Sequence, residues 1–190
     1  GWLGAVGKRP EEERLFPEGF AGGERQRGGI ARAMAPQQEL VSCDEPVSAL
    51  DVAGQAQVLN LMRDLQRSLG LTYLFISHNL AVVYFISDRL GVMYLGRLVE
   101  VGPAREIFAH PRHPYTRMLL DTIPDLEMTG RERMPVAGEV PNPINPPTGC
   151  SFHPRCPFVT DRCRSEAPAH RAYGETMIAC HGVEENRIPA

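Results

Sequence analysis

The stretch Leu40-Val41-Ser42-Cys43-Asp44-Glu45-Pro46 decides the fold predicted from this sequence. Its apolar part, residues 40–43, is too short for a helix, and Pro46 prevents a helix from continuing through the two acids. The pattern therefore predicts a buried strand that ends where Asp44 and Glu45 reach solvent. In open α/β sheets, ligands bind at the carboxyl ends of the strands. Two acids there suit a magnesium ion and an attacking water, whereas the simpler alternative is a solvated strand end followed by a turn.

Two further segments stand on either side of this strand. Phe20-Ala21-Gly22-Gly23-Glu24 lies upstream, and Phe75-Ile76-Ser77-His78 lies downstream. In order and spacing, the three segments resemble the ATP-binding subunits of ABC transporters. By this resemblance, residues 20–24 correspond to the signature motif, 40–45 to Walker B, 48–51 to the D-loop, and His78 to the switch histidine.

The resemblance implies a role in ATP hydrolysis for each of these motifs. Asp44 would support Mg²⁺, Glu45 would polarise the attacking water, and His78 would contact the γ-phosphate. Asp51 would couple the two nucleotide sites of an ATPase dimer. The signature positions would face the nucleotide held by the partner subunit: Ala21, Gly22, Gly23 and Glu24. Glycines permit a close backbone approach, and the N-terminus of the helix that follows favours an anion.

Two signature positions depart from the family pattern. Ala21 stands where the family usually has Ser, and Glu24 stands where it usually has Gln. The missing hydroxyl removes a hydrogen bond to a phosphate oxygen, worth about 1.5–3 kcal/mol. The Glu24 carboxylate adds negative charge beside a site for an anion. We therefore expect a weakened signature, either because the two sites of the dimer are unequal or because the chain is a decayed copy.

The sequence contains no phosphate-binding loop of the GxxxxGK[ST] type. Residues 1–9 come nearest, but Trp2 and Arg9 stand where Gly and Ser or Thr are required. We therefore expect the chain to start inside the helical subdomain of a longer ATPase, with the P-loop upstream. Alone, these 190 residues are expected not to hydrolyse ATP, because the phosphate cradle and its lysine supply most of the electrostatic stabilisation.

Apolar periodicity and turn residues predict the elements around these motifs. Apolar residues repeat at helical spacing over residues 52–69, and Gly70 is a fitting helix end. Gly96 separates two apolar runs and predicts a hairpin. The expected elements are a glycine turn and helix within residues 20–35, a helix at 52–69, a strand at 71–76, a helix at 80–85, strands at 89–95 and 97–101, and a helix at 103–109.

The composition changes from His110 onward. Seven prolines between Pro135 and Pro157 predict an extended, irregular segment. Residues 144–157, together with His113-Pro114-Tyr115-Thr116, closely resemble the C-terminal extension of the oligopeptide and dipeptide branch of ABC ATPases. The predicted fold class is therefore α/β. Residues 1–109 would be the C-terminal half of a P-loop ABC ATPase domain, and residues 110–190 an irregular, proline-rich, cysteine-bearing extension.

Four of the five cysteines lie in this extension: Cys150, Cys156, Cys163 and Cys180. Zinc sites usually show closer pairs, and disulfides are disfavoured in a cytosolic chain. Four thiolates with loop spacings, one beside Pro157, suit a [4Fe–4S] cluster. The resembled branch is associated with such a cluster at matching positions, and we expect one here. Zinc and simple reduced thiols are the alternatives, and Cys43 is expected to be a core residue.

Composition argues against several other classes of protein. A hydrophobic content of 43% and a net charge of −3 are ordinary for a globular protein and give no basic excess for nucleic acid. No run of 18 apolar residues could span a bilayer, and the first residues lack the order of a signal peptide. With the resemblance, this predicts a peripheral protein on the cytoplasmic face of the inner (plasma) membrane.

The resemblance implies the energising ATPase subunit of an importer of di- or oligopeptides, or of a related small solute. Its partners would be a second ABC ATPase subunit and membrane-spanning permease subunits, and it would use ATP and Mg²⁺. One alternative is a non-catalytic remnant that acts as a dimer partner or cluster-binding module. Another is an ABC-type protein of repair or translation, which residues 113–116 and the four cysteines disfavour.

Overall fold

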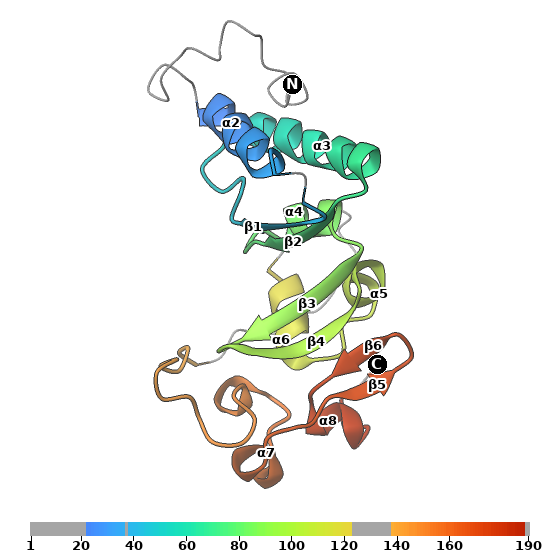
Figure 1. Cartoon of the computed structure of the whole chain (residues 1–190). Coiled ribbons are helices and arrows are strands. Elements are labelled where there is room, and N and C mark those ends of the chain that lie inside the picture. The colour runs from blue at the N-terminus through green and yellow to red at the C-terminus, as the bar shows by residue number, and fades with distance from the viewer. Residues whose placement is uncertain (1–21, 37, 123–137, 189–190) are drawn as a thin grey trace, which may run out of the picture. The chain divides into compact units, whose positions relative to one another are not determined.

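The computed structural model describes residues 22–36, 38–122 and 138–188. The chain divides into two compact units, Gly1–Ile86 and Ser87–Ala190, which we call the N-terminal and C-terminal units (Figure 1). Residues 1–9, excluded above as a P-loop, and Ala21 of the signature lie outside the described residues. Residues 123–137, which include the first three positions of the proline-rich segment, also lie outside the described residues.

The N-terminal unit is built on two parallel strands. Its elements are α2 (Gly22–Met34), β1 (Leu40–Asp44), α3 (Val52–Leu69), β2 (Thr72–Ile76) and α4 (Leu80–Ile86). The strands pair in register from Leu40 with Thr72 to Asp44 with Ile76. A parallel pair needs a crossover connection, which α3 provides. Both strands therefore end at the same edge, where the Glu45 N–H donates to the Ile76 carbonyl at 3.0 Å.

Helix α3 has the bounds predicted from the sequence because both of its ends are capped locally. At the start, the Asp51 carboxylate accepts the N–H of Gly54 at 2.8 Å. At the end, Gly70 adopts φ 66°, a left-handed conformation that glycine takes without a Cβ clash. The cap residue Asp51 thereby fixes where the segment after Walker B enters the helix.

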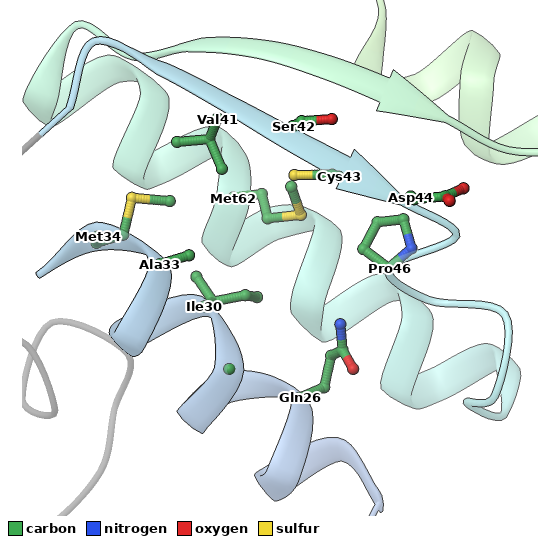
Figure 2. Close-up of a pocket in the computed structure, with 11 residues that line it drawn as sticks. Gln26, Ile30, Ala33, Met34, Val41, Ser42, Cys43, Asp44, Pro46 and Met62 are labelled. Atoms are coloured by element: carbon green, nitrogen blue, oxygen red, sulfur yellow. The ribbon is translucent and has the colours of Figure 1, made fainter. Parts of the chain in front are cut away.

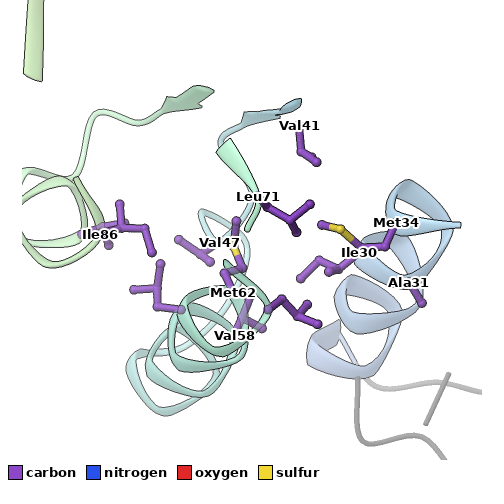
Figure 3. Packing of buried hydrophobic residues seen from close by; sticks show 12 residues of the cluster. Ile30, Ala31, Met34, Val41, Val47, Val58, Met62, Leu71 and Ile86 are labelled. Carbon is purple, nitrogen blue, oxygen red and sulfur yellow. The ribbon is translucent and has the colours of Figure 1, made fainter. Parts of the chain in front are cut away.

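The core of the N-terminal unit lies between the helices and one face of the strand pair (Figure 3). Met62 on α3 and Val58 one turn before it are almost fully buried. Val41 of β1 packs against the same cluster as Ile30 and Met34 of α2. This burial of apolar surface is what holds β1, and so the two acids after it, against α2 and α3.

The C-terminal unit contains a four-stranded antiparallel sheet in the order β3-β4-β6-β5. Strands β3 (Arg89–Tyr94) and β4 (Arg97–Pro103) form the predicted hairpin. Its turn residues, Leu95 and Gly96, both have positive φ, as the tight turns that match the strand twist require. Two strands that the sequence did not suggest, β5 (Arg171–Tyr173) and β6 (Thr176–Ile178), complete the sheet.

The C-terminal unit also contains short helices: α5 (Ala104–Ala109), α6 (Pro114–Leu120), the 3₁₀ turn η3 (His153–Arg155), α7 (Asp161–Ser165) and α8 (His181–Glu184). Glu100 of β4 is fully buried and accepts the N–H groups of Arg112 and His113 at 3.0 and 3.1 Å, which anchors the entry into α6. Burial raises the pKa of this carboxyl. The C-terminal unit starts at Ser87. The domain boundary at residue 109, which was predicted from the motifs, lies later in the chain and stays a prediction.

Candidate functional site

The acid after β1 and the imidazole after β2 meet at the shared strand edge. The Nδ1 atom of His78 lies 2.7 Å from Oε1 of Glu45, and the His78 backbone N–H donates to the same oxygen at 3.0 Å. The Ser77 hydroxyl donates to the second oxygen, Oε2, at 3.5 Å. Glu45 itself has φ 47°, an uncommon conformation for a residue with a Cβ. The parallel pairing of β1 with β2 thus brings together the residue predicted to polarise the attacking water and the residue predicted to contact the γ-phosphate.

The hydrogen bonds at this edge keep the carboxylate ionised. The side-chain hydrogen bond from His78 is the main reason that the pKa of Glu45 lies below its usual value. Both side chains reach solvent, with His78 80% exposed and Glu45 33% exposed. An ionised carboxylate paired with an imidazole in reach of solvent is able to orient a water molecule and accept a proton from it.

Asp44 ends β1 and borders a separate pocket (Figure 2). This pocket of about 240 Å³ lies between α2, β1 and α3. Most of its lining is apolar, and its polar groups come from Gln26, Ser42 and Asp44. Glu45 and His78 do not line it, so the pocket and the carboxylate–imidazole pair are different places. We assign the chemistry to the pair, because that is where the polar groups converge.

Other predicted positions take local structural roles. Gly22, Gly23 and Glu24 form the first turn of α2, where the sequence predicted a glycine turn before the helix. Asp51, expected to couple two nucleotide sites, caps α3. Cys43 is half-buried against the core of the N-terminal unit, and burial raises the pKa of its thiol. This agrees with a packing role for Cys43.

The four cysteines of the extension gather in the C-terminal unit. Beyond the effect of burial, the other three thiols each raise the pKa of Cys156, so all four lie close enough to interact electrostatically. The Cys150 N–H donates to the Cys163 carbonyl at 2.9 Å. Burial raises the pKa of the thiols of Cys150 and Cys180, and raises that of Cys156 to about 12. These thiols are therefore protonated and unreactive unless a metal displaces the proton.

Backbone N–H groups surround these sulfur atoms. Those of Phe152 and His153 donate to Cys150, that of Phe158 to Cys156, and those of Gly182 and Val183 to Cys180. The Thr160 hydroxyl lies 3.4 Å from the sulfur of Cys163. Hydrogen bonds of this kind stabilise thiolates, and they tune sulfur ligands of metal centres.

Four cysteines are the kind of ligands that a thiolate-bound metal centre uses, but the structure does not arrange them as a metal site. Among the described residues, no three Cys, His, Asp or Glu side chains are arranged as a metal-binding group. The [4Fe–4S] cluster therefore stays a prediction from the sequence.

Two residues that sequence reasoning missed shape these sites. Ser77 contacts the Glu45 carboxylate, and its place directly before His78 was the available signal. Gly149 lets the loop before Cys150 approach the backbone of Cys163: a Cβ there would lie 2.5 Å from the Cys163 carbonyl oxygen. Its sequence signal was a glycine among prolines, which does not reveal the distant segment it touches.

Curated relatives match most of the chain. The di/tripeptide transport ATP-binding protein DppF of Pseudomonas aeruginosa is 50% identical over 181 residues, which cover 95% of this chain and 56% of that protein. The oligopeptide transport ATP-binding protein AppF of Bacillus subtilis is 50% identical over 94% of this chain and 56% of its own length. The dipeptide transport ATP-binding protein DppF of Escherichia coli is 48% identical, over 98% and 56%. The chain belongs to the ABC transporter ATP-binding subunits.

The C-terminal extension and the fold agree with this family. Residues 99–163 match a family model described as "Oligopeptide/dipeptide transporter, C-terminal region". A metal-chelate type ABC transporter in an inward-facing conformation is 32% identical, with a TM-score of 0.52 over 56% of this chain and 41% of that one. CbiO1 from Clostridium perfringens is 26% identical, with a TM-score of 0.53 over 57% and 43%. The chain spans little more than half the length of the curated relatives above. No helix in the described part of the chain has the length and apolar character needed to cross a membrane.

Proposed function

We propose that this chain is part of an ATPase subunit that energises the import of di- or oligopeptides, or of a related small solute. The observation that carries the proposal is the 2.7 Å contact between Glu45 and His78 at the ends of two parallel strands. Support also comes from the family, whose members named above are peptide transport ATP-binding proteins.

Each residue of the pair has a distinct role in the proposed reaction. Glu45 orients the attacking water and accepts its proton, and the hydrogen bonds from Ser77 and His78 fix the direction of its carboxylate. His78 contacts the γ-phosphate through its exposed imidazole. Asp44 would hold Mg²⁺, and the ion would supply positive charge beside the triphosphate.

The remaining parts of the proposal concern partners and location. The signature residues Ala21, Gly22, Gly23 and Glu24 face a nucleotide on a second ATPase subunit, and Asp51 couples the two sites. Membrane-spanning permease subunits bind the pair of ATPases at the cytoplasmic face of the membrane. These assignments follow the family resemblance, and the names of the relatives support them.

The first experiment compares ATP hydrolysis by two proteins. The 190-residue chain is expected to show no hydrolysis above background, because it has no phosphate cradle. A protein that also contains the upstream reading frame, up to a GxxxxGK[ST] segment, is expected to hydrolyse ATP. Absence of such a segment, or inactivity of the longer protein with its partner, would favour the non-catalytic alternative, for which Ala21 and Glu24 are the supporting residues.

We propose further that Cys150, Cys156, Cys163 and Cys180 hold a [4Fe–4S] cluster. Their mutual proximity and the N–H groups on their sulfur atoms support this assignment. Anaerobically prepared protein is expected to show the visible charge-transfer absorption of a cluster, with iron and sulfide in equal amounts. A colourless protein with one zinc ion per chain would contradict the cluster and favour the zinc alternative.

A further inference from the structure

The backbone of Glu45 is held in an unusual conformation. Its φ is 47°, whereas a residue that precedes a proline, as Glu45 precedes Pro46, normally has an extended backbone with negative φ. A conformation of this kind persists only where the surrounding structure holds it, and such residues cluster at functional sites. The contacts that hold this backbone therefore bear on the carboxylate that it carries.

Hydrogen bonds hold the backbone of Glu45 on both sides. Its N–H donates to the Ile76 carbonyl at 3.0 Å. Its carbonyl accepts two hydrogen bonds from Ser48, one from the hydroxyl at 3.1 Å and one from the backbone N–H at 3.4 Å. Residues 45–48 thus form a turn with Pro46 at its second position, where the fixed φ of proline is favoured. Of these contacts, the one from the Ser48 hydroxyl can be removed by a substitution without changing the backbone.

The position of Ser48 is itself fixed by packing. Val47, directly before it, is only 2% exposed and belongs to the core of the N-terminal unit. The side chain of Ser48 reaches solvent, so a change of its hydroxyl leaves this core intact. A substitution at Ser48 therefore tests the contact with Glu45 and not the packing of the unit.

We propose that Ser48 is a positioning residue for the reaction: its hydroxyl fixes the Glu45 peptide group, and through it the direction in which the carboxylate meets His78. The proposal rests on the proposed ATPase function. With its N–H and its carbonyl both held, Glu45 directs its Cα–Cβ bond so that a carboxylate oxygen lies 2.7 Å from Nδ1 of His78. By the family resemblance, Ser48 begins the segment 48–51, whose expected role is to couple two subunits. The role proposed for Ser48 acts within one chain.

The test measures ATP hydrolysis by the subunit that includes the upstream phosphate-binding half. Ser48→Ala is expected to lower kcat about 3–10-fold, the effect of losing one neutral hydrogen bond, and to leave KM for ATP unchanged. Ser48→Thr keeps the hydroxyl and is expected to restore the rate. Ser68→Ala is the matched control, because the Ser68 hydroxyl also donates to a carbonyl three positions earlier, that of Leu65 at 3.3 Å, but within α3. This control is expected to leave kcat unchanged.

The pH dependence of hydrolysis gives a readout that a purely structural role would not move. The hydrogen bond from His78 is the main reason that the pKa of Glu45 lies below its usual value, and a carboxylate that turns away from His78 loses part of this effect. The acid limb of the kcat/KM profile is therefore expected to move to higher pH in Ser48→Ala, and to stay in place in Ser48→Thr and Ser68→Ala.

A kcat of Ser48→Ala equal to that of the unmodified subunit would overturn the proposal. So would an equal loss of kcat in Ser68→Ala, or a Ser48→Thr protein that is no more active than Ser48→Ala. A loss of kcat in Ser48→Ala with a lowered thermal midpoint and an unmoved acid limb would also overturn it, because that result assigns Ser48 to stability alone.

A second measurement separates this proposal from the proposed function. In the 190-residue chain, NMR measures the pKa of the Glu45 carboxyl, which is expected to rise in Ser48→Ala but not in Ser68→Ala. If the longer subunit hydrolyses no ATP and this rise is found, the ATPase function fails and the positioning role stands. If ATP is hydrolysed and neither kcat nor the carboxyl pKa changes in Ser48→Ala, the positioning role fails and the ATPase function stands.

Discussion

Glu45→Gln is expected to lower kcat for ATP hydrolysis by about 10²–10⁴-fold in the subunit that includes the upstream phosphate-binding half. The amide keeps the size of the side chain but cannot accept a proton from water. Binding of ATP is expected to persist, because the phosphate cradle and its lysine supply most of the electrostatic stabilisation of the nucleotide. Steady-state hydrolysis and equilibrium nucleotide binding, measured on the same preparation, check both statements.

Asp64→Asn is the matched control for this substitution. Asp64 lies on α3 with its side chain 74% exposed, and it forms a 4.0 Å ion pair with Arg67. The same change from acid to amide there is expected to leave hydrolysis unchanged. A Glu45→Gln protein that hydrolyses ATP within a few-fold of the unmodified subunit would show that the proton acceptor is another group.

Gly149→Ala is expected to destabilise the C-terminal unit and to prevent iron loading. Gly149 has φ 68°, where a residue with a Cβ is strained by about 1–2 kcal/mol. The new Cβ would also lie 2.5 Å from the Cys163 carbonyl oxygen and 2.8 Å from the Arg164 carbonyl carbon, both backbone atoms. Relieving this overlap is expected to cost about 1–3 kcal/mol more and to move Cys150 away from Cys163. The free energy of unfolding in urea and the iron content measure the two effects.

Gly174→Ala separates the strain from the overlap. Gly174 has φ 64°, nearly the same conformation, but a Cβ there would meet nothing within 4 Å. This variant is expected to show only the conformational cost and to load iron normally. Equal destabilisation of the two variants would mean that the backbone at Gly149 lies farther from the backbone of Cys163 than the structure shows.

The sequence predicted best those elements whose determinants are local. Helix α3 was predicted with its observed bounds because Asp51 and Gly70 cap it from adjacent positions. The hairpin of β3 and β4 was predicted from the apolar runs around Gly96, and β1 from the apolar run before the acids. The proximity of Glu45 and His78 came from family resemblance, and parallel pairing is the physical reason that it is observed.

What the sequence did not predict depends on distant partners. Strands β5 and β6 have three residues each, too few for a periodic signal, and they exist because β6 pairs with β4. Glu100 is an ordinary charged residue in the sequence, yet it is fully buried because the N–H groups of Arg112 and His113 reach it. The same applies to Arg187, whose Nη1 atom donates to the Phe158 carbonyl 29 positions earlier in the chain.

The pairing of β4 with β6 has a consequence for synthesis of the protein. The hairpin of β3 and β4 can form as soon as it leaves the ribosome, but the region that covers its open edge is made much later. His170, just before β5, contacts the Leu98 carbonyl from 72 positions further along the chain. At about 5–20 residues per second, translation leaves that edge bare for several seconds. During that interval the unpaired edge of β4 is exposed, and the nascent chain is most prone to aggregate by pairing with other chains there.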